Sequence, residues 1–359
     1  MKEIYHIAEN VSFESGGVRT ILLLLNNYLN QNKIPSNIIT NLKEEADNFI
    51  HFETNKPWFY QKEIKSYLEN LSKNTSIFHL HGAYSYTQYV SSEVAIKNKI
   101  PYLLSPHGML EPRVLAKNSL KKKLYLQLIL NKIIKNAQFL HCITPIEKDS
   151  LYKLTQHKNI VEIPNLMDFS TIPTDLNYEP KENYFLFIGR PDKIKGLELL
   201  INALASLNTK KVKLKIVGPE NDYTTTLKQL TNRLGLENIV EFLGPIFNHE
   251  KYNLIANARA VVVPSYSEVI GMVNLEASAC KTPVITTHQT GLKTEFGSMG
   301  GILINPEIEE IKNALQDSLQ WNELERIERG KSLQKFVFEN YSWEQKGNLW
   351  LELYNKISI

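Results

Sequence analysis

The stretch Pro264–Val284, PSYSEVIGMVNLEASACKTPV, indicates the fold of this 359-residue chain. It follows the apolar run Ala260–Val263, which is typical of a buried strand. Gly271 allows a tight turn, and a helix is expected to begin near Met272. A strand, a short loop and a helix in this order form the repeating unit of a parallel sheet covered by helices. The stretch therefore predicts an α/β domain.

The same stretch carries two carboxylates that are eight positions apart. Glu268 is expected in the loop, and Glu276 about one turn inside the helix. The backbone amides of Gly271, Met272 and Val273 would point at an anion bound at the helix N-terminus. A carboxylate can accept hydrogen bonds from paired sugar hydroxyls. The alternative is that one acid caps the helix and the other is solvated.

The alternation of apolar runs and helical patterns continues on both sides of this stretch, with an interruption that contains three prolines. It predicts two doubly wound, Rossmann-like domains of class α/β, with ligands at the carboxyl ends of the strands in a cleft between them. The expected parts are an N-terminal domain (1–170), a linker (171–183), a C-terminal domain (184–342) and a final amphipathic helix (343–359).

A second loop with charged residues, Phe187–Leu197, follows the predicted strand Tyr184–Ile188. Arg190 and Lys195 lie on this loop, and two cations at the end of a strand suit a diphosphate. The phosphate-binding motif G-x-x-x-x-G-K-[ST] is absent. The alternative is a pair of solvated surface cations.

Two motifs in the N-terminal half lie where predicted strands end. Gly16 and Gly17 stand between the first strand and the first helix, where backbone amides can approach a phosphate. His107 follows the strand at 102–105 in the sequence SPHGMLEP. Each has a plainer alternative, a simple turn for the glycines and a structural role for the histidine.

Taken together and in this order, these motifs resemble the retaining GT-B glycosyltransferases of family 4, the "group 1" enzymes. The resemblance covers nearly the whole chain. It implies that residues 1–170 are the acceptor-side domain, that residues 184–342 are the nucleotide-sugar domain, and that the final helix (343–359) returns to the first domain. Pro264–Val284 is similar to the family's P-S-x-x-E-x-x-G-x-x-x-x-E-A signature. The supporting matches are Gly189-Arg190 with Lys195-Gly196, Ile163-Pro164-Asn165, Ser105-Pro106-His107-Gly108, and Gly16-Gly17.

The resemblance implies a role for each matching residue. Arg190 and Lys195 would bind the donor diphosphate, and Glu276 the nucleotide ribose. Glu268 would contact hydroxyls of the donor sugar. The remaining implied contacts are the amides of Gly271, Met272 and Val273 with phosphate and sugar, His107 with the donor sugar, and Gly16 and Gly17 with the diphosphate.

Two departures from the family pattern affect what the resemblance implies about the donor. Lys281 stands where the family often has glycine, and Val269-Ile270 replaces the commoner Gly-Phe. Both changes lie close to the expected sugar pocket. Donor identity is therefore not transferred from the family, and UDP is the first expectation for the nucleotide, with GDP second.

Composition narrows the function further. With 41 Lys plus Arg against 38 Asp plus Glu, the net charge of +3 is too small to indicate nucleic-acid binding. The two cysteines, Cys142 and Cys280, exclude a disulfide scaffold and fit a cytoplasmic protein. There is no D-x-D sequence, so we expect a metal-independent enzyme without a cofactor. His79 and His81 share a strand face and form a conceivable metal pair, but no third ligand is evident.

Residues 117–136, KNSLKKKLYLQLILNKIIKN, form a candidate basic amphipathic helix in which Lys121–Lys123 lie beside leucines. Such a helix can lie on an anionic membrane surface, or it can pack its leucines into the core and solvate its lysines. No signal peptide or spanning segment is evident. We therefore expect a cytoplasmic protein with a possible peripheral contact at the inner membrane face.

The function that these features predict is sugar transfer from a nucleotide-sugar to a hydroxyl of a glycan or a polyprenyl-linked glycolipid. By family analogy, the acceptor would be a precursor of a bacterial surface polysaccharide, such as lipopolysaccharide or capsule. The alternatives are a non-catalytic GT-B binding protein, a GT-B nucleotide-sugar epimerase and a phosphorylase. A phosphorylase would need a lysine for pyridoxal phosphate, which the sequence does not indicate.

Overall fold

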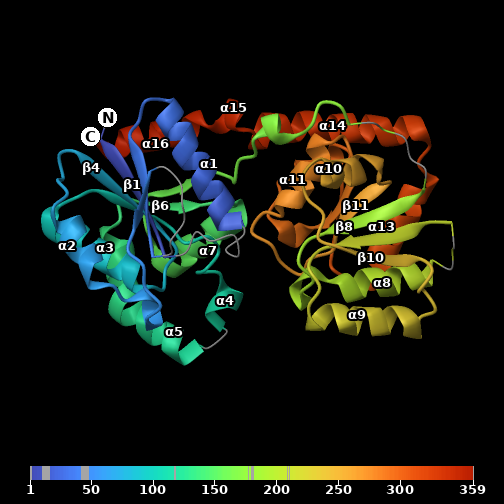
Figure 1. Ribbon diagram of the computed structural model, residues 1–359, viewed down its shortest axis with the longest axis horizontal. Coiled ribbons are helices and arrows are strands. Elements are labelled where there is room, and N and C mark those ends of the chain that lie inside the picture. The colour runs from blue at the N-terminus through green and yellow to red at the C-terminus, as the bar shows by residue number, and fades with distance from the viewer. Residues whose placement is uncertain are drawn as a thin grey trace. The chain divides into compact units, whose positions relative to one another are not determined.

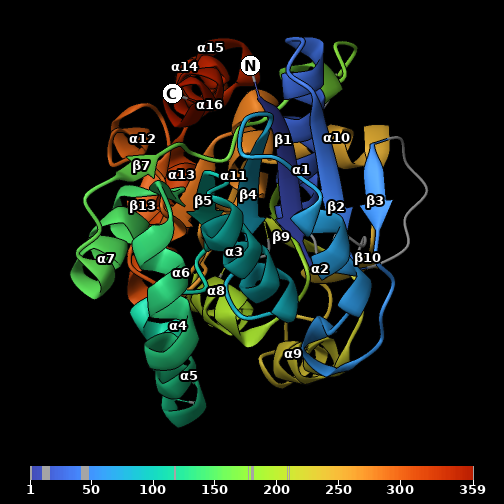
Figure 2. The ribbon, with the colours of Figure 1, turned by 90° about the vertical axis from the view of Figure 1, so that its left-hand side faces the viewer.

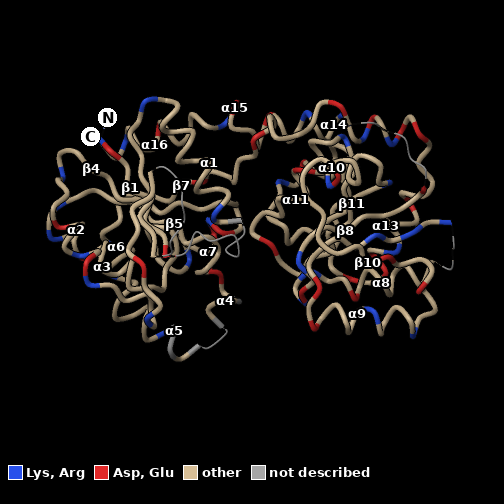
Figure 3. Tube along the Cα trace, viewed as in Figure 1, with Lys and Arg blue, Asp and Glu red and all other residues tan. Residues whose placement is uncertain are grey.

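A computed structural model of the chain describes residues 2–9, 17–41, 48–116, 119–176, 178, 182–207, 209 and 211–358. Its contacts separate two units, shown in Figure 1. Unit 1 comprises Met1–Leu166 and Gly347–Ile359, and unit 2 comprises Met167–Lys346. The sequence had suggested boundaries at residues 170 and 343. Lysines and arginines are interspersed with aspartates and glutamates along both units (Figure 3).

Unit 1 is built on a parallel sheet of seven strands in the order β3-β2-β1-β4-β5-β6-β7. The strands are β1 (Glu3–Ala8), β2 (Ser36–Thr40), β3 (Phe49–His51), β4 (Ser76–His81), β5 (Tyr102–Ser105), β6 (Phe139–Cys142) and β7 (Ile160–Glu162). The helices are α1 (Gly17–Gln31), α2 (Lys62–Glu69), α3 (Tyr86–Asn98), α4 (Pro112–Ala116), α5 (Ser119–Tyr125), α6 (Asn131–Asn136), α7 (Pro145–Thr155) and α16 (Asn348–Ser358).

The two faces of this sheet differ in chemistry because successive strand residues point to opposite sides. Tyr5 and Ile7 lie on the apolar face, where they join a buried cluster with residues of α2, α3 and α6. Figure 2 shows α3 and α6 over this side of the sheet. The other face carries His6 and Ala8, and there Ala8 packs against Leu22 of α1.

Unit 2 repeats the architecture with six parallel strands in the order β10-β9-β8-β11-β12-β13. These are β8 (Tyr184–Ile188), β9 (Lys213–Val217), β10 (Val240–Gly244), β11 (Ala260–Val263), β12 (Val284–Thr287) and β13 (Ile302–Ile304). The main helices are α8 (Leu197–Ser206), α9 (Asp222–Arg233), α10 (Asn248–Asn257), α11 (Met272–Ala279), α13 (Ile308–Gln320), α14 (Glu323–Tyr341) and α15 (Trp343–Lys346). The predicted pair of parallel, helix-covered sheets is confirmed.

Two predicted helices differ in detail. The expected final helix is interrupted at Gly347, which separates α15 from α16. The expected helix over 117–136 begins outside the described residues. Its described part consists of α5, the π-helical segment Leu126–Leu130 and α6. Among the helices that the structure describes, none has both the length and the apolar character needed to span a bilayer.

The second face of the unit 1 sheet carries a buried row of polar side chains beneath α16. The parallel register pairs His6 with His79 and His81 with Ser105 across the sheet. Tyr354 of α16 meets this row, since its hydroxyl lies 2.7 Å from His79 Nδ1. His79 Nε2 lies 2.6 Å from Ser105 Oγ, and Ser105 Oγ lies 2.8 Å from His141 Nδ1.

With neutral rings, the direction of every hydrogen bond in this row is fixed by its last member. The carbonyl of Ile163, 2.8 Å from His141 Nε2, can only accept. His141 Nδ1 must therefore accept from the Ser105 hydroxyl, and Ser105 must accept from His79 Nε2–H. His79 Nδ1 is left to accept from Tyr354 O–H. The Tyr354 hydroxyl of α16 is thus the donor at the start of this row.

Replacing Tyr354 by Phe is expected to destabilise the protein by about 1–3 kcal/mol, because His79 Nδ1 loses its donor while it stays buried. Urea denaturation measures the change. Tyr152→Phe is the matched control, since Tyr152 is 56% exposed. Equal stabilities of the two variants would contradict the assignment.

Candidate functional site

Two loops at the carboxyl edge of the unit 2 sheet are fastened together. They follow β8 and β11, which are neighbours in the sheet. The Tyr266 N–H donates to the Ile194 carbonyl over 2.8 Å. Gly196 has φ +65°, and a Cβ at this position would lie 2.2 Å from the Pro264 carbonyl oxygen. Only glycine permits this approach, which brings Lys195 to the loop after β11.

Lys195 and Glu268, both predicted as site residues, are in direct contact. The Lys195 ammonium forms an ion pair with Glu268 Oε1, which also accepts from Ser265 Oγ at 3.1 Å. The Glu268 backbone N–H donates to the Gln289 carbonyl at 3.0 Å, so the acid is held by its backbone as well. Only 13% of the Glu268 side chain is exposed. A charge-assisted hydrogen bond in such a setting is stronger than a solvated pair.

Helix α11 begins as predicted at Met272, directly after Gly271. Its N-terminus receives no side-chain cap, so the alternative that Glu268 caps this helix is wrong. A Cβ on Gly271 would lie 3.6 Å from the Glu268 carboxyl carbon, which places the carboxylate beside the start of the helix. The first amides of α11, including that of Val273, are intrahelical orphans of the kind that bind anions.

Glu276 forms a second ion pair, with Lys251 of α10, at 3.0 Å between Lys251 Nζ and Glu276 Oε1. Burial alone would lower the pKa of Lys251, but the Glu276 carboxylate outweighs it and the pKa is raised. The alternative of a solvated acid is therefore wrong for Glu276. Lys251 escaped the sequence analysis because nothing in its own helix marks it as a site residue.

Arg190 and Lys195 come from the same loop but differ in their surroundings. Arg190 is exposed at the end of β8, directly after Gly189, whose N–H donates to the Val217 carbonyl. Lys195 lies half-buried against Glu268. The structure thus groups Lys195 with Glu268 and leaves Arg190 open to solvent.

Of the predicted residues of unit 1, Gly17 and His107 lie at the carboxyl edge of its own sheet. Gly16 is outside the described residues, and Gly17 is the first residue of α1. His107 has φ 52°, a left-handed conformation that is uncommon for a residue with a side chain. Its loop is held by Glu147 of α7, whose Oε1 accepts from the Gly108 N–H at 2.7 Å.

Glu147 connects two loops and was missed by the sequence analysis. Its Oε2 accepts from the Ile143 N–H at 2.8 Å, so one buried carboxylate ties the loop after β5 to the loop after β6. Burial raises the pKa of this carboxyl. The available signal was the start of α7, where Thr144 caps the helix and accepts from the Glu147 N–H.

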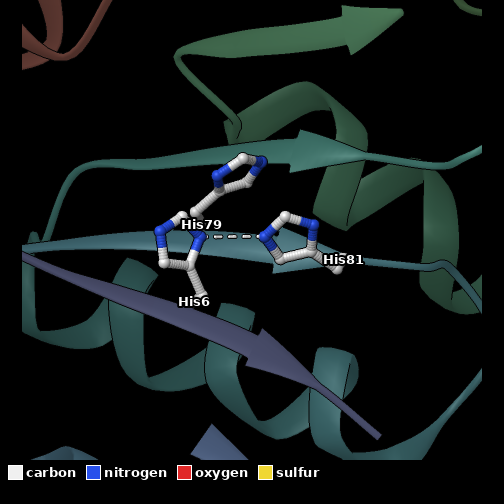
Figure 4. Close-up of side chains that lie close together, drawn as sticks. All are labelled: His6, His79 and His81. Carbon is white, nitrogen blue, oxygen red and sulfur yellow. Dashed lines mark hydrogen bonds between the residues drawn. The ribbon is translucent and has the colours of Figure 1, made fainter. Parts of the chain in front are cut away.

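His107 is the first member of a second row of hydrogen-bonded side chains. His107 Nε2 lies 2.9 Å from His81 Nδ1, and His81 Nε2 lies 3.0 Å from His6 Nδ1. Figure 4 shows His6, His79 and His81 close together, with the hydrogen bond between His6 and His81 dashed. Nitrogen atoms of these three residues lie within 4.8 Å of one another, so His6 is a third candidate ligand that the sequence did not indicate. Both nitrogens of His79 and of His81 already have hydrogen-bond partners, which a metal ion would have to displace.

Known proteins resemble this chain in sequence, most of all in unit 2. Residues 168–332 match the family "Glycosyl transferases group 1". An uncharacterized glycosyltransferase of Methanocaldococcus jannaschii is 27% identical over 77% of this chain and 75% of its own length. A D-inositol 3-phosphate glycosyltransferase of Gordonia bronchialis is 30% identical over 51% of this chain. That match spans only 42% of the relative's length.

Solved structures resemble the whole chain. Sucrose-phosphate synthase from Thermosynechococcus elongatus has a TM-score of 0.79 at 21% identity, with 99% of each chain covered. HepE of Anabaena, solved in complex with UDP-glucose, has a TM-score of 0.78 at 17% identity, with 99% of this chain and 100% of that chain covered.

The two helix-covered parallel sheets give the chain the GT-B fold, which these solved structures share with it. The match of residues 168–332 to the family glycosyl transferases group 1 lies within unit 2 and covers most of it.

The buried histidines of unit 1 make the stability of the folded protein depend on pH. Burial lowers the pKa of His6 and His107 to about 3 and that of His141 to about 4, below the ordinary value of 6.5. The unfolded chain therefore binds more protons than the folded chain between these values, so stability falls as the pH is lowered through this window.

We expect the free energy of unfolding to decrease below about pH 6.5 by up to ~1.4 kcal/mol per pH unit for each histidine that stays neutral. Urea denaturation at a series of pH values measures the slope. His141→Asn, which removes one such imidazole, should reduce that slope. A stability that stays flat down to about pH 4.5 would refute the expectation.

Proposed function

We propose that this chain is a retaining glycosyltransferase that moves a sugar from a nucleotide-sugar to a hydroxyl of a glycan or glycolipid acceptor. The proposed acceptor is a precursor of a bacterial surface polysaccharide, handled in the cytoplasm. The reaction is proposed to need no metal ion or other cofactor. UDP is the preferred nucleotide and GDP the second candidate.

The observation that carries the proposal is the contact between Lys195 and Glu268 beside the start of α11. It places a cation, a carboxylate and orphan helix amides at one edge of a parallel sheet, where ligands of doubly wound folds bind. Lys195 and the exposed Arg190 would take the diphosphate. Glu268 would take sugar hydroxyls, and Glu276 the ribose.

This arrangement suits the charge that develops when the bond between the sugar and the phosphate breaks. The leaving nucleoside diphosphate gains negative charge, and the two cations and the helix N-terminus would offset it where it forms. Removal of one such contact costs roughly 3–4 kcal/mol of transition-state stabilisation. The leaving phosphate can itself accept the proton of the acceptor hydroxyl, so no second carboxylate is needed as the base.

The comparisons favour UDP over other nucleotides as the first experiment, because HepE was solved with UDP-glucose. The relatives named as D-inositol 3-phosphate glycosyltransferase and the neighbour named sucrose-phosphate synthase act on other acceptors by their names, so the polysaccharide role rests on family analogy. The alternatives are a non-catalytic GT-B binding protein and a nucleotide-sugar epimerase.

A thermal-shift panel with UDP, GDP, dTDP, ADP and CMP tests the donor site. UDP is expected to stabilise the wild type by about 2.7 kcal/mol at one hundred times its dissociation constant. Arg190→Ala and Glu276→Ala should weaken this stabilisation. Glu268→Ala should lower the turnover of sugar transfer more than it lowers nucleotide affinity.

The matched control is Arg233→Ala, which removes an arginine at the end of α9 in the same unit. A response to no nucleotide would favour the non-catalytic alternative. Hydrolysis or epimerisation of the donor without an acceptor would favour the epimerase. Full transfer activity in Glu268→Ala would show that the site is assigned wrongly.

We propose, from a separate observation, that α5 and the π-helical segment Leu126–Leu130 after it contact an anionic membrane surface. Leu120, Leu124 and Leu128 recur at every fourth position and are 82%, 55% and 70% exposed. They therefore lie on one side of the helical rod and do not pack into the core. The lysines at 121–123 lie on the same helix. Exposed leucines on a helix whose sequence also contains lysines have the chemistry of an interfacial helix.

The triple variant Leu120→Ser, Leu124→Ser and Leu128→Ser is expected to lose co-sedimentation with anionic vesicles, because the apolar contact is removed while the charge is kept. Leu324→Ser is the control, since Leu324 is 73% exposed on α14 of the other unit. Equal sedimentation of the two variants would contradict the membrane contact.

A further inference from the structure

The row His6–His81–His107 has a property that follows from hydrogen-bond counting. A neutral imidazole has one N–H donor and one bare nitrogen acceptor. His81 is bonded through both nitrogens, to His107 at 2.9 Å and to His6 at 3.0 Å. It must therefore donate to one neighbour and accept from the other. The three rings have only two protonation patterns, one the reverse of the other.

The two patterns differ at the ends of the row. In the first, His6 Nδ1–H donates to His81, His81 Nδ1–H donates to His107 Nε2, and His107 carries its proton on Nδ1. In the second, His107 Nε2–H and His81 Nε2–H donate in the opposite direction. His107 Nδ1 is then bare, and the proton of His6 lies on Nε2.

The buried end of the row decides between these patterns. His6 Nε2 is fully buried and has no hydrogen-bond partner among the described residues. The second pattern would bury an N–H without an acceptor there, whereas the first leaves only a bare nitrogen. Among backbone groups, buried N–H groups without an acceptor are rarer than under-satisfied carbonyl oxygens, and we apply the same order to the imidazole nitrogens. His79 cannot accept a hydrogen bond from His6 Nε2, because both of its nitrogens are already bonded, to Tyr354 and Ser105.

We infer that His81, held in turn by His6, is a positioning residue that fixes His107 as an Nδ1–H donor toward its ligand. The inference deepens the proposed function and rests on it for the identity of that ligand, an oxygen of the donor sugar or its phosphate. His107 then supplies a hydrogen bond to that oxygen and cannot accept a proton at Nδ1, so it is not the general base.

The backbone supports this role because it leaves His107 little freedom. Its left-handed φ of 52° and the Glu147 carboxylate bound to Gly108 fix the loop. The His81 and His107 rings are stacked at 12° with centroids 5.2 Å apart, which fixes the ring plane. The remaining variable is the position of one proton, and His81 sets it.

The direct test is the tautomer of His107 in the wild-type protein. Protonated and bare imidazole nitrogens give well separated ¹⁵N signals, and the His107→Gln variant assigns them. We expect the proton on Nδ1. A proton on Nε2 would overturn the inference, whether or not the protein transfers sugar. This readout therefore stays valid if the proposed function fails.

Kinetics give the second test through a matched pair of variants at His81. The amide nitrogen of Asn can replace the Nδ1–H donor, whereas Leu removes it. We expect His81→Leu to lower kcat about 10–100-fold with KM for the nucleotide-sugar nearly unchanged, as for loss of other supporting contacts, and His81→Asn to restore most of it. His157→Asn, at another histidine of unit 1, should leave kcat unchanged.

Two outcomes would overturn the inference from kinetics. Equal loss in His81→Leu and His81→Asn would show that His81 matters only for packing. A stoichiometric metal ion in the purified protein, with activity lost on chelation, would show that the histidines bind a metal ion. They would then not form the row of hydrogen bonds on which the inference rests. If no nucleotide of the panel stabilises the protein, the proposed function fails instead, and the tautomer measurement decides the inference alone.

Discussion

The hydrogen bond from Tyr354 to His79 is the contact on which much of unit 1 depends. The final helix is far from the first strands in sequence, and this bond places it over the polar face of the sheet. The row that it begins must stay neutral, because a charge on any of these fully buried imidazoles would lose its hydration without gaining a counter-charge. The face can therefore be polar and still act as a core, provided that every proton is in its place.

In unit 2, polar side chains that are partly buried are held by ion pairs, whereas unit 1 uses hydrogen bonds between neutral rings. Lys195 with Glu268, and Lys251 with Glu276, place opposite charges in contact at positions that are only partly exposed. The geometry depends on the approach of Gly196 to the Pro264 carbonyl, since a side chain there would push the two loops apart. Breaking one partner would leave the other charge poorly solvated, which costs more than the pair itself gains.

The sequence analysis found the site residues that lie close together along the chain. Gly271, Glu268 and Glu276 lie within one strand-to-helix stretch, and the alternation around them predicts both sheets. It did not find Lys251 or Glu147, because each reaches its partner from another helix, and no spacing reports such a contact. The shared face of His79 and His81 followed from strand periodicity, but His6 and His141 join them only through the register of parallel strands, which a single sequence does not encode.

The paired charges of unit 2 also constrain which ligand can bind there. A simple phosphate at Lys195 would compete with Glu268 and leave that carboxylate, 13% exposed, without its cation. A nucleotide-sugar brings hydroxyls as well as phosphates, so on the proposed function it satisfies the lysine and the carboxylate at once. The same holds at Glu276, where ribose hydroxyls can share the carboxylate with Lys251. A ligand that carries both kinds of group leaves none of these partly buried charges without a partner. This favours an intact nucleotide-sugar over its separate parts.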